Sequence, residues 1–342
     1  HQLVSEGNIY FLSRPRRFGK SLLVSTLKAY FKGKKELFNG LAIDGLVTEW
    51  AEYPVFHLDF NGVDFTQEGV LDNRINKWLS DYETIYGRNP NSLNQGDRFS
   101  DLLKAAHQQT GRRAVVLIDE YDKPMLQAIG NEDLQIQFRN MLKAFYGTLK
   151  SADGYLRFVL LTGVTKFSKL SIFSDLNNIE DISMEKQYCD ICGITEEELH
   201  NVFDNEVALL AENNEQTKEE AYKELKKRYD GYHFSENSVG IYNPFSILLA
   251  LKNSNYGSYW FSTGTPTYLV ELLKRFDYSL ENLSGYEASA TTLDSIQLNV
   301  DNPIPVLYQS GYLTIKGYDR ELRLYTLDFP NEEVEEGFVN FL

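Results

Sequence analysis

A glycine, a lysine and a serine placed between a short apolar stretch and a helical pattern constrain this chain more than any other feature. Residues 8–13 (NIYFLS) are mostly apolar, aromatic or β-branched, which predicts a strand. Gly19, Lys20 and Ser21 follow shortly after, and apolar residues then recur at helical spacing up to Phe31. Strand, loop and helix in this order form the context that a phosphate-binding loop requires.

The loop departs from the pattern G-x-x-x-x-G-K-[ST] at its first position, where Arg14 replaces glycine. Pro15 follows Arg14, and a residue before proline is pushed towards extended backbone. The turn can therefore start differently and still deliver the glycine, lysine and serine at its end. Arg16 and Arg17 either bring positive charge to bound phosphates or contact a partner domain.

We expect the second half of this loop to bind a nucleotide through backbone N–H groups at the positive end of the following helix. Lys20 would reach the β- and γ-phosphates, and the Ser21 hydroxyl would bind Mg²⁺. Gly19 has no Cβ and lets the backbone approach a ligand closely. The expected nucleotide-binding residues are Arg16, Arg17, Phe18, Gly19, Lys20, Ser21 and Leu22.

A second motif, AVVLIDE at residues 114–120, is a continuous apolar run that ends in two acids. Such a run is typical of a strand buried on both faces of a parallel sheet. Asp119 would hold Mg²⁺ through water, and Glu120 would polarise the attacking water. Acids at a strand end can also simply cap the next helix, but their occurrence together with the loop favours nucleotide binding.

A third buried strand is predicted over residues 156–162 (LRFVLLT), and it ends at Thr162. A polar residue at this place would sense the γ-phosphate, with Thr162 as the first candidate and Thr165 as the second. The alternative is a threonine that caps the following turn. Strands that alternate with helices up to this point predict an α/β fold with a parallel, doubly wound sheet, that is, a P-loop NTPase core.

Beyond this core the pattern becomes helical. Thr195 with Glu198 three residues later predicts a helix N-terminus, and further helices are predicted in "QTKEEAYKELKKRYDGYHF", "NPFSILLALKN" and "TPTYLVELLKRF". Near the end, "PIPVLYQSG" predicts a short helix before two β-type runs, Tyr312–Lys316 and Leu322–Leu327, which is the outline of a winged-helix module. We therefore expect an ATPase core over 1–185, a helical lid over 186–300 and a winged-helix-like end over 301–342.

The net charge of the chain disfavours some classes of binding partner. The chain has 34 basic and 49 acidic residues, and its net charge of −15 disfavours binding to nucleic acid or to an anionic membrane. No apolar run approaches the length of a transmembrane helix. The two cysteines, in Cys189-Asp190-Ile191-Cys192, have no second ligand pair for zinc, and so few cysteines suit reduced thiols in the cytoplasm.

With these motifs in place, the chain resembles the bacterial AAA-ATPase-like family, P-loop proteins with an additional strand and a catalytic glutamate. The matching stretches are "YFLSRPRRFGKSLL", "YPVFHLDF", "VVLIDEYDKP", "FVLLTGVTKFSK", "RYDGYHF", "YNPFSILLAL", "YWFSTGTPTYLV" and "LYQSGYLTIKGYD". The family shares the replacement of the first glycine. The resemblance implies ATP as the nucleotide and a lid that closes over it.

The resemblance also implies further roles. His233 would contact the β-phosphate from the lid, or hold structure beside its aromatic neighbours, and Arg228 would be a sensing arginine or a helix-end residue. Many members carry a PD-(D/E)XK nuclease-like domain after this region, which would be a C-terminal partner outside this chain. The assembly state stays open, with a homo-oligomer as one candidate.

These features predict Mg²⁺-dependent ATP binding with slow hydrolysis, used as a conformational switch. Glu120, Lys20 and Thr162 would be the catalytic residues, and Ser21 and Asp119 the metal-binding residues. The alternative is a non-hydrolysing nucleotide-binding scaffold that regulates an attached nuclease-like domain or another partner.

Overall fold

The computed structural model describes residues 1–6, 9–166, 173, 176, 178–262, 283–294 and 302–341. The described residues divide into two compact units. Unit 1 consists of His1–Leu12, Ser21–Gly163 and Phe167–Asp181, and unit 2 of Ser13–Lys20, Val164–Lys166 and Ile182–Leu342. The chain thus leaves unit 1 at the end of its first strand, contributes the phosphate loop to unit 2, and returns to unit 1 in the following helix. The expected division into three domains stays a prediction.

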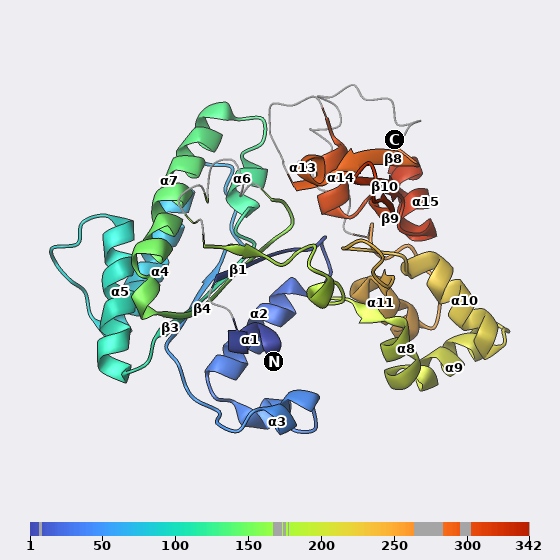
Figure 1. Cartoon of the computed structure of the whole chain (residues 1–342), viewed down its shortest axis with the longest axis horizontal. Helices are drawn as coiled ribbons and strands as arrows, with labels where there is room; N and C mark the ends of the chain where they lie inside the picture. The colour runs from blue at the N-terminus through green and yellow to red at the C-terminus, as the bar shows by residue number, and fades with distance from the viewer. Residues whose placement is uncertain are drawn as a thin grey trace. The chain divides into compact units, whose positions relative to one another are not determined.

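In the part of unit 1 that the structure describes, a five-stranded sheet has the order β2-β3-β4-β1-β5 (Figure 1). Its strands are β1 (Ile9–Ser13), β2 (Val55–Asp59), β3 (Ala114–Asp119), β4 (Leu156–Gly163) and β5 (Glu180–Asp181). The pairs β2–β3, β3–β4 and β1–β5 are parallel. β4 lies between β1 and β3, so it is the additional strand of the expected layout. The predicted α/β fold with a parallel sheet is confirmed.

Helices cover both faces of this sheet, as alternate side chains of a strand require. On β2, the Phe56 ring packs on Tyr82 of α4, at 4.6 Å between ring centroids. The next residue, His57, places its Nδ1 3.3 Å from Nζ of Lys28 in α2. Neighbouring residues of one strand thus meet helices on opposite sides, and the sheet is doubly wound (Figure 1).

The helices of unit 1 follow the sequence periodicity. Their bounds are α1 (Gln2–Glu6), α2 (Lys20–Phe31), α3 (Ala42–Leu46), α4 (Val70–Tyr86), α5 (Gln95–Thr110), α6 (Lys123–Gln127) and α7 (Glu132–Ser151), with short 3₁₀ turns at η1 (Lys35–Phe38) and η2 (Asp153–Tyr155). Asn94 and Asn131 cap α5 and α7, because each side chain accepts a hydrogen bond from a backbone N–H of the first turn. Helices thus alternate with the strands of the sheet, as the sequence pattern predicts.

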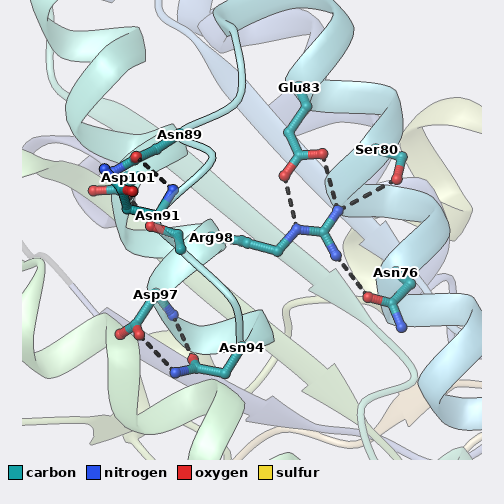
Figure 2. A network of polar contacts seen from close by, with 10 residues as sticks. Asn76, Ser80, Glu83, Asn89, Asn91, Asn94, Asp97, Arg98 and Asp101 are labelled. Atoms are coloured by element: carbon teal, nitrogen blue, oxygen red, sulfur yellow. Dashed lines mark hydrogen bonds and ion pairs between the residues drawn. The ribbon is translucent and has the colours of Figure 1, made fainter.

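A buried ion pair joins α4 to α5 (Figure 2). Arg98 donates from Nε to Glu83 Oε1 at 2.7 Å and from Nη2 to Glu83 Oε2 at 2.9 Å. Asn76 and Ser80, also on α4, accept further hydrogen bonds from the guanidinium. Both charged side chains are 8% exposed, so the pair lies inside the helix interface.

Unit 2 contains a helical part with its own apolar core. Its elements are η4 (Lys186–Tyr188), β6 (Ile194–Thr195), α8 (Glu196–Val202), α9 (Asp204–Asn213), α10 (Lys218–Tyr229), β7 (Ile241–Tyr242) and α11 (Pro244–Asn253). Leu210, Leu225 and Ile247, from α9, α10 and α11, are fully buried in one cluster. The predicted capping box is present at Thr195 and Glu198. The helical run that follows divides at Phe203 into α8 and α9.

The end of the chain forms a small antiparallel sheet with strand order β8-β10-β9. The elements are β8 (Tyr286–Ser289), α13 (Ala290–Asp294), α14 (Ile304–Ser310), β9 (Thr314–Asp319), β10 (Leu324–Asp328) and α15 (Glu332–Phe341). The expected succession of a short helix and a hairpin is therefore present, although β8 adds a strand that the pattern did not predict. A winged-helix identity of this part stays a prediction.

The helix predicted in "TPTYLVELLKRF" lies outside the described residues. No helix in the part of the chain that the structure describes is both long and apolar enough to cross a membrane.

Candidate nucleotide-binding site

The two predicted polar residues at the ends of β3 and β4 are bonded to each other. Asp119 is 2% exposed, and Thr162 is fully buried. The Thr162 hydroxyl donates to Asp119 Oδ1 at 2.7 Å. Parallel strands end at the same edge of a sheet, which is where α/β proteins bind ligands. The sheet therefore brings the expected metal-binding acid and the expected γ-phosphate sensor into direct contact.

Asn61 extends this cluster from a third strand, and the sequence reasoning missed it. It follows β2 directly after Phe60, and its Nδ2 lies 3.5 Å from Asp119 Oδ2. Its Oδ1 accepts a hydrogen bond from Lys123 Nζ at 3.3 Å. The available signal was the position of Asn61 directly after "YPVFHLDF", one of the stretches that carry the resemblance to the family.

Glu120 lies next to the buried acid but in a different environment. Its side chain is 30% exposed, and its Oε2 lies 3.2 Å from Nζ of Lys123, which opens α6. Its φ is 54°, a left-handed conformation that non-glycine residues adopt rarely. Such strain costs about 1–3 kcal/mol and occurs most often at functional sites. The turn thus buries Asp119 while it leaves the neighbouring carboxylate accessible to solvent.

The turn after β3 packs against an aromatic cluster through Tyr121. The Tyr121 ring lies edge-on to Phe11 of β1, with 5.4 Å between centroids, and 5.2 Å from Phe173. Gly163 makes room for the turn, because a Cβ there would lie 2.6 Å from the Tyr121 ring and 2.8 Å from a carboxylate oxygen of Asp122. Dense packing around Tyr121 thus fixes the turn that directly follows Asp119 and Glu120.

The phosphate loop places its lysine and glycine as follows. Lys20 is buried, and its Nζ donates to the carbonyl oxygens of Arg14 and Pro15, at 2.9 Å each. Gly19 has a φ of 79°, and a Cβ built on it would meet no atom within 4 Å. The glycine is therefore required by its backbone conformation, and the space beside it is open. Ser21 and Leu22, in the first turn of α2, are exposed.

Arg14, the residue in place of the first glycine, is 1% exposed, so its side chain is inside unit 2. Its guanidinium donates to the carbonyl oxygens of Ser183 at 2.8 Å, Tyr188 at 2.7 Å and Ile191 at 3.2 Å. The Phe234 ring covers it at 4.1 Å. The substituted position thus fastens the start of the loop to residues 183–191, a role that no local pattern indicates.

The Phe18 side chain is buried, and the Arg17 side chain is half-buried. Nη1 of Arg17 donates to the carbonyl oxygens of Tyr259 and Trp260, at 2.5 and 2.9 Å. The Phe18 ring is fully buried and packs edge-on against Tyr232 and Phe234. The Arg17 guanidinium thus contacts backbone of residues 259 and 260, which belong to the same unit as the loop.

The residues considered for a lid have local partners. His233 donates its backbone N–H to the Thr314 hydroxyl, and its Nδ1 lies 2.8 Å from the Ser238 carbonyl oxygen. Arg228, near the end of α10, donates from Nε to Glu224 Oε1 at 2.5 Å. Thr165, the second sensor candidate, is fully buried.

Two comparisons with known proteins bear on this site. A family model described as a predicted AAA-ATPase matches residues 1–173, which contain the strand, the phosphate loop, the two acids and Thr162. This chain belongs to the AAA-ATPase-like family. A protein from Azotobacter chroococcum mcd 1, named as an uncharacterized protein in the vnfD 5′ region, is 36% identical over 339 residues. The match covers 98% of this chain and 63% of that protein, so the chain spans less than two thirds of its curated relative.

Membership of the AAA-ATPase-like family indicates a nucleotide-binding protein. The cluster around Asp119 also suits Mg²⁺ chemically, because Mg²⁺ prefers oxygen ligands and is usually held by one or two carboxylates together with substrate phosphates. The Asp119 carboxylate and the Ser21 hydroxyl are ligands of this kind.

Proposed function

We propose that this AAA-ATPase-like protein binds ATP with Mg²⁺ and hydrolyses it slowly as a conformational switch. The buried Asp119, which accepts a hydrogen bond from Thr162 beside the accessible Glu120, is the observation that carries the proposal. A carboxylate that is fixed from the neighbouring strand can hold a metal, while an exposed one next to it can orient water.

Each residue of the proposed site has a separate task. Lys20 and the backbone amides of residues 16–22 stabilise negative charge on the phosphates. Asp119 and Ser21 would hold Mg²⁺, which supplies charge neutralisation when it is bound. Thr162 reports on the γ-phosphate through its bond to Asp119, and Glu120 orients the attacking water.

Slow turnover follows from two considerations. The Glu120 carboxylate is ion-paired with Lys123, which must be loosened before Glu120 can bind water. An arginine supplied in trans accelerates reactions of this class by roughly 10³–10⁵. We therefore expect the isolated chain to release phosphate slowly.

The ion pair of Glu120 with Lys123 also favours a second candidate, a non-hydrolysing scaffold. In that case nucleotide binding alone would regulate a nuclease-like domain or another partner. The relative from Azotobacter chroococcum is longer than the region matched here, which leaves room for such a domain in that protein.

Substitution of Glu120 separates the two candidates. Glu120→Gln keeps the shape of the side chain and removes its charge, so MgATP should still bind while phosphate release falls by about 10²-fold or more, the range for loss of a general base. Glu68→Gln is the matched control, because Glu68 is exposed in unit 1 and outside the cluster. Binding is measured by calorimetry and turnover by phosphate release.

Three results would contradict parts of the proposal. Hydrolysis by Glu120→Gln at the parent rate would refute the assigned role of Glu120. Phosphate release by the parent no faster than the uncatalysed hydrolysis of MgATP, with MgATP binding intact, would establish the scaffold. Equal MgATP affinity in Lys20→Ala and the parent would place the nucleotide elsewhere.

A further inference from the structure

The side chain of Arg17 joins the phosphate loop to one short segment of unit 2. Nη1 of its guanidinium donates to the carbonyl oxygens of Tyr259 and Trp260 and to the Ser262 hydroxyl, at 2.5, 2.9 and 3.3 Å. The Phe245 ring of α11 lies under the guanidinium, 4.0 Å from Cζ to the ring centroid. We call residues 259–262 the receiving segment.

A side chain of the receiving segment also donates a hydrogen bond to the loop. Trp260 donates from Nε1 to the Arg16 carbonyl oxygen at 3.4 Å, and its backbone N–H donates to Glu333 Oε1 at 2.8 Å. Glu333 is 2% exposed; burial raises the pKa of its carboxyl group, and the positive charge of Arg17 opposes that rise. Backbone, ring and charge contacts thus converge on the same few residues.

The backbone of Arg17 is in the left-handed region, with φ 68°. A non-glycine residue keeps this conformation only where its surroundings enforce it, at a cost of about 1–3 kcal/mol. The contacts of its guanidinium supply that enforcement. Gly19, with φ 79°, lies two residues later, so the same short loop contains a second left-handed residue.

We propose that Arg17 is a positioning residue that transmits nucleotide binding from the phosphate loop to the receiving segment. The proposal rests on the proposed function, since it requires a nucleotide at the loop. Phosphates that bind to the amides of residues 16–22 shift the loop, and the Arg17 guanidinium carries the shift to the carbonyl groups of residues 259 and 260. Arg17 therefore acts through the loop rather than as a phosphate ligand.

Arg17→Gly is the sharpest test, because glycine adopts the left-handed backbone without strain while the guanidinium is lost. Phe245→Leu removes the ring from the other side of the same contact and keeps an apolar side chain. Arg16→Ala is the matched control, since it removes the neighbouring arginine side chain and keeps the carbonyl group that Trp260 contacts. A double variant, Arg17→Gly with Phe245→Leu, completes the cycle.

The measurements are MgATP binding by calorimetry and amide hydrogen exchange of residues 255–262 with and without MgATP. In the parent and in Arg16→Ala, we expect MgATP to change exchange in this segment by about tenfold, within the usual range of coupling between sites. In Arg17→Gly the change should fall below about twofold, and Phe245→Leu should lie between. The double variant should match Arg17→Gly, because both substitutions break one contact.

Other results would overturn the inference. A nucleotide-dependent change in exchange that survives in Arg17→Gly would show that Arg17 transmits nothing. Losses of MgATP affinity that add up in the double variant, with the larger loss in Arg17→Gly, would make Arg17 a phosphate ligand. Failure of the parent to bind MgATP would instead refute the proposed function itself, so the two failures are distinguishable.

Discussion

At the scale of single residues, Gly163 shows how tightly the end of β4 is packed. A Cβ at this position would lie 2.6 Å from the Tyr121 ring and 2.8 Å from Asp122, so no methyl group fits without a shift of both. Gly163→Ala should lower the free energy of unfolding by about 1–3 kcal/mol, the usual cost of overpacking. Denaturant unfolding of the purified protein measures it.

Gly147 provides the matched control. It lies inside α7, and a Cβ there would meet no atom within 4 Å. Gly147→Ala should raise the free energy of unfolding by about 0.5–1 kcal/mol, because alanine loses less backbone entropy in a helix. Equal effects of the two substitutions would show that the close approach at Gly163 does not govern stability.

The contacts of the Arg14 side chain could not be predicted from the sequence. The departure from the phosphate-loop pattern was visible, and Pro15 indicated an altered turn. Three of the carbonyl groups to which the Arg14 guanidinium donates belong to residues that lie 169 to 177 positions away along the chain. Since every residue has a carbonyl group, no side-chain pattern could indicate these partners.

At the scale of elements, the Arg98–Glu83 pair holds α4 against α5 (Figure 2). Arg98→Met leaves the buried Glu83 without its partner and should lower the free energy of unfolding by about 3–5 kcal/mol. Lys77→Met is the control, because Lys77 pairs with Asp81 on the same helix but both are more than half exposed. Its effect should stay below about 1 kcal/mol. If both variants lost a similar free energy of unfolding, burial would not explain the effect of the Arg98–Glu83 pair.

The Arg98–Glu83 pair should also make the free energy of unfolding depend on pH. Hydrogen bonds from Arg98 hold the pKa of Glu83 below its usual value near 4.3. A lowered folded-state pKa means that the stabilisation is complete above the unfolded-state pKa and is lost as the pH falls through the folded-state pKa. The stability difference between the parent and Glu83→Gln should therefore be constant from pH 7 to pH 5 and shrink below about pH 4. A constant difference down to pH 3 would contradict it.

Secondary-structure elements were predicted better than the contacts between them. The strand, loop and helix around Lys20, the buried β3 and the capping box at Thr195 follow from spacing and local chemistry alone. The break between α8 and α9 at Phe203 was missed, since the apolar spacing continues across it.

At the scale of the whole molecule, binding of MgATP should raise the free energy of unfolding. A ligand at 100 times its dissociation constant stabilises the folded protein by about 2.7 kcal/mol. For units of this size the midpoint of thermal unfolding should rise by about 5–10 °C with MgATP. Removal of Mg²⁺ with EDTA should abolish most of the rise.

Lys20→Ala should remove this shift, because the ammonium group is proposed to bind the phosphates. Lys104→Ala is the control, since Lys104 is exposed on α5. A full shift in Lys20→Ala, or one that is unaffected by EDTA, would contradict Mg²⁺-dependent binding at the loop.

Patterns along the chain were enough to predict the strand, loop and helix around Lys20, the buried β3 with its two terminal acids, and the helix start at Thr195. These follow from periodicities of two and 3.6 residues and from turn and capping chemistry, which act over a few neighbouring residues. The contact of Thr162 with Asp119 and the anchoring of Arg17 by residues 259–262 became visible in the tertiary structure alone. Those contacts depend on which surfaces pack together, and carbonyl groups or buried hydroxyls leave no pattern along the chain.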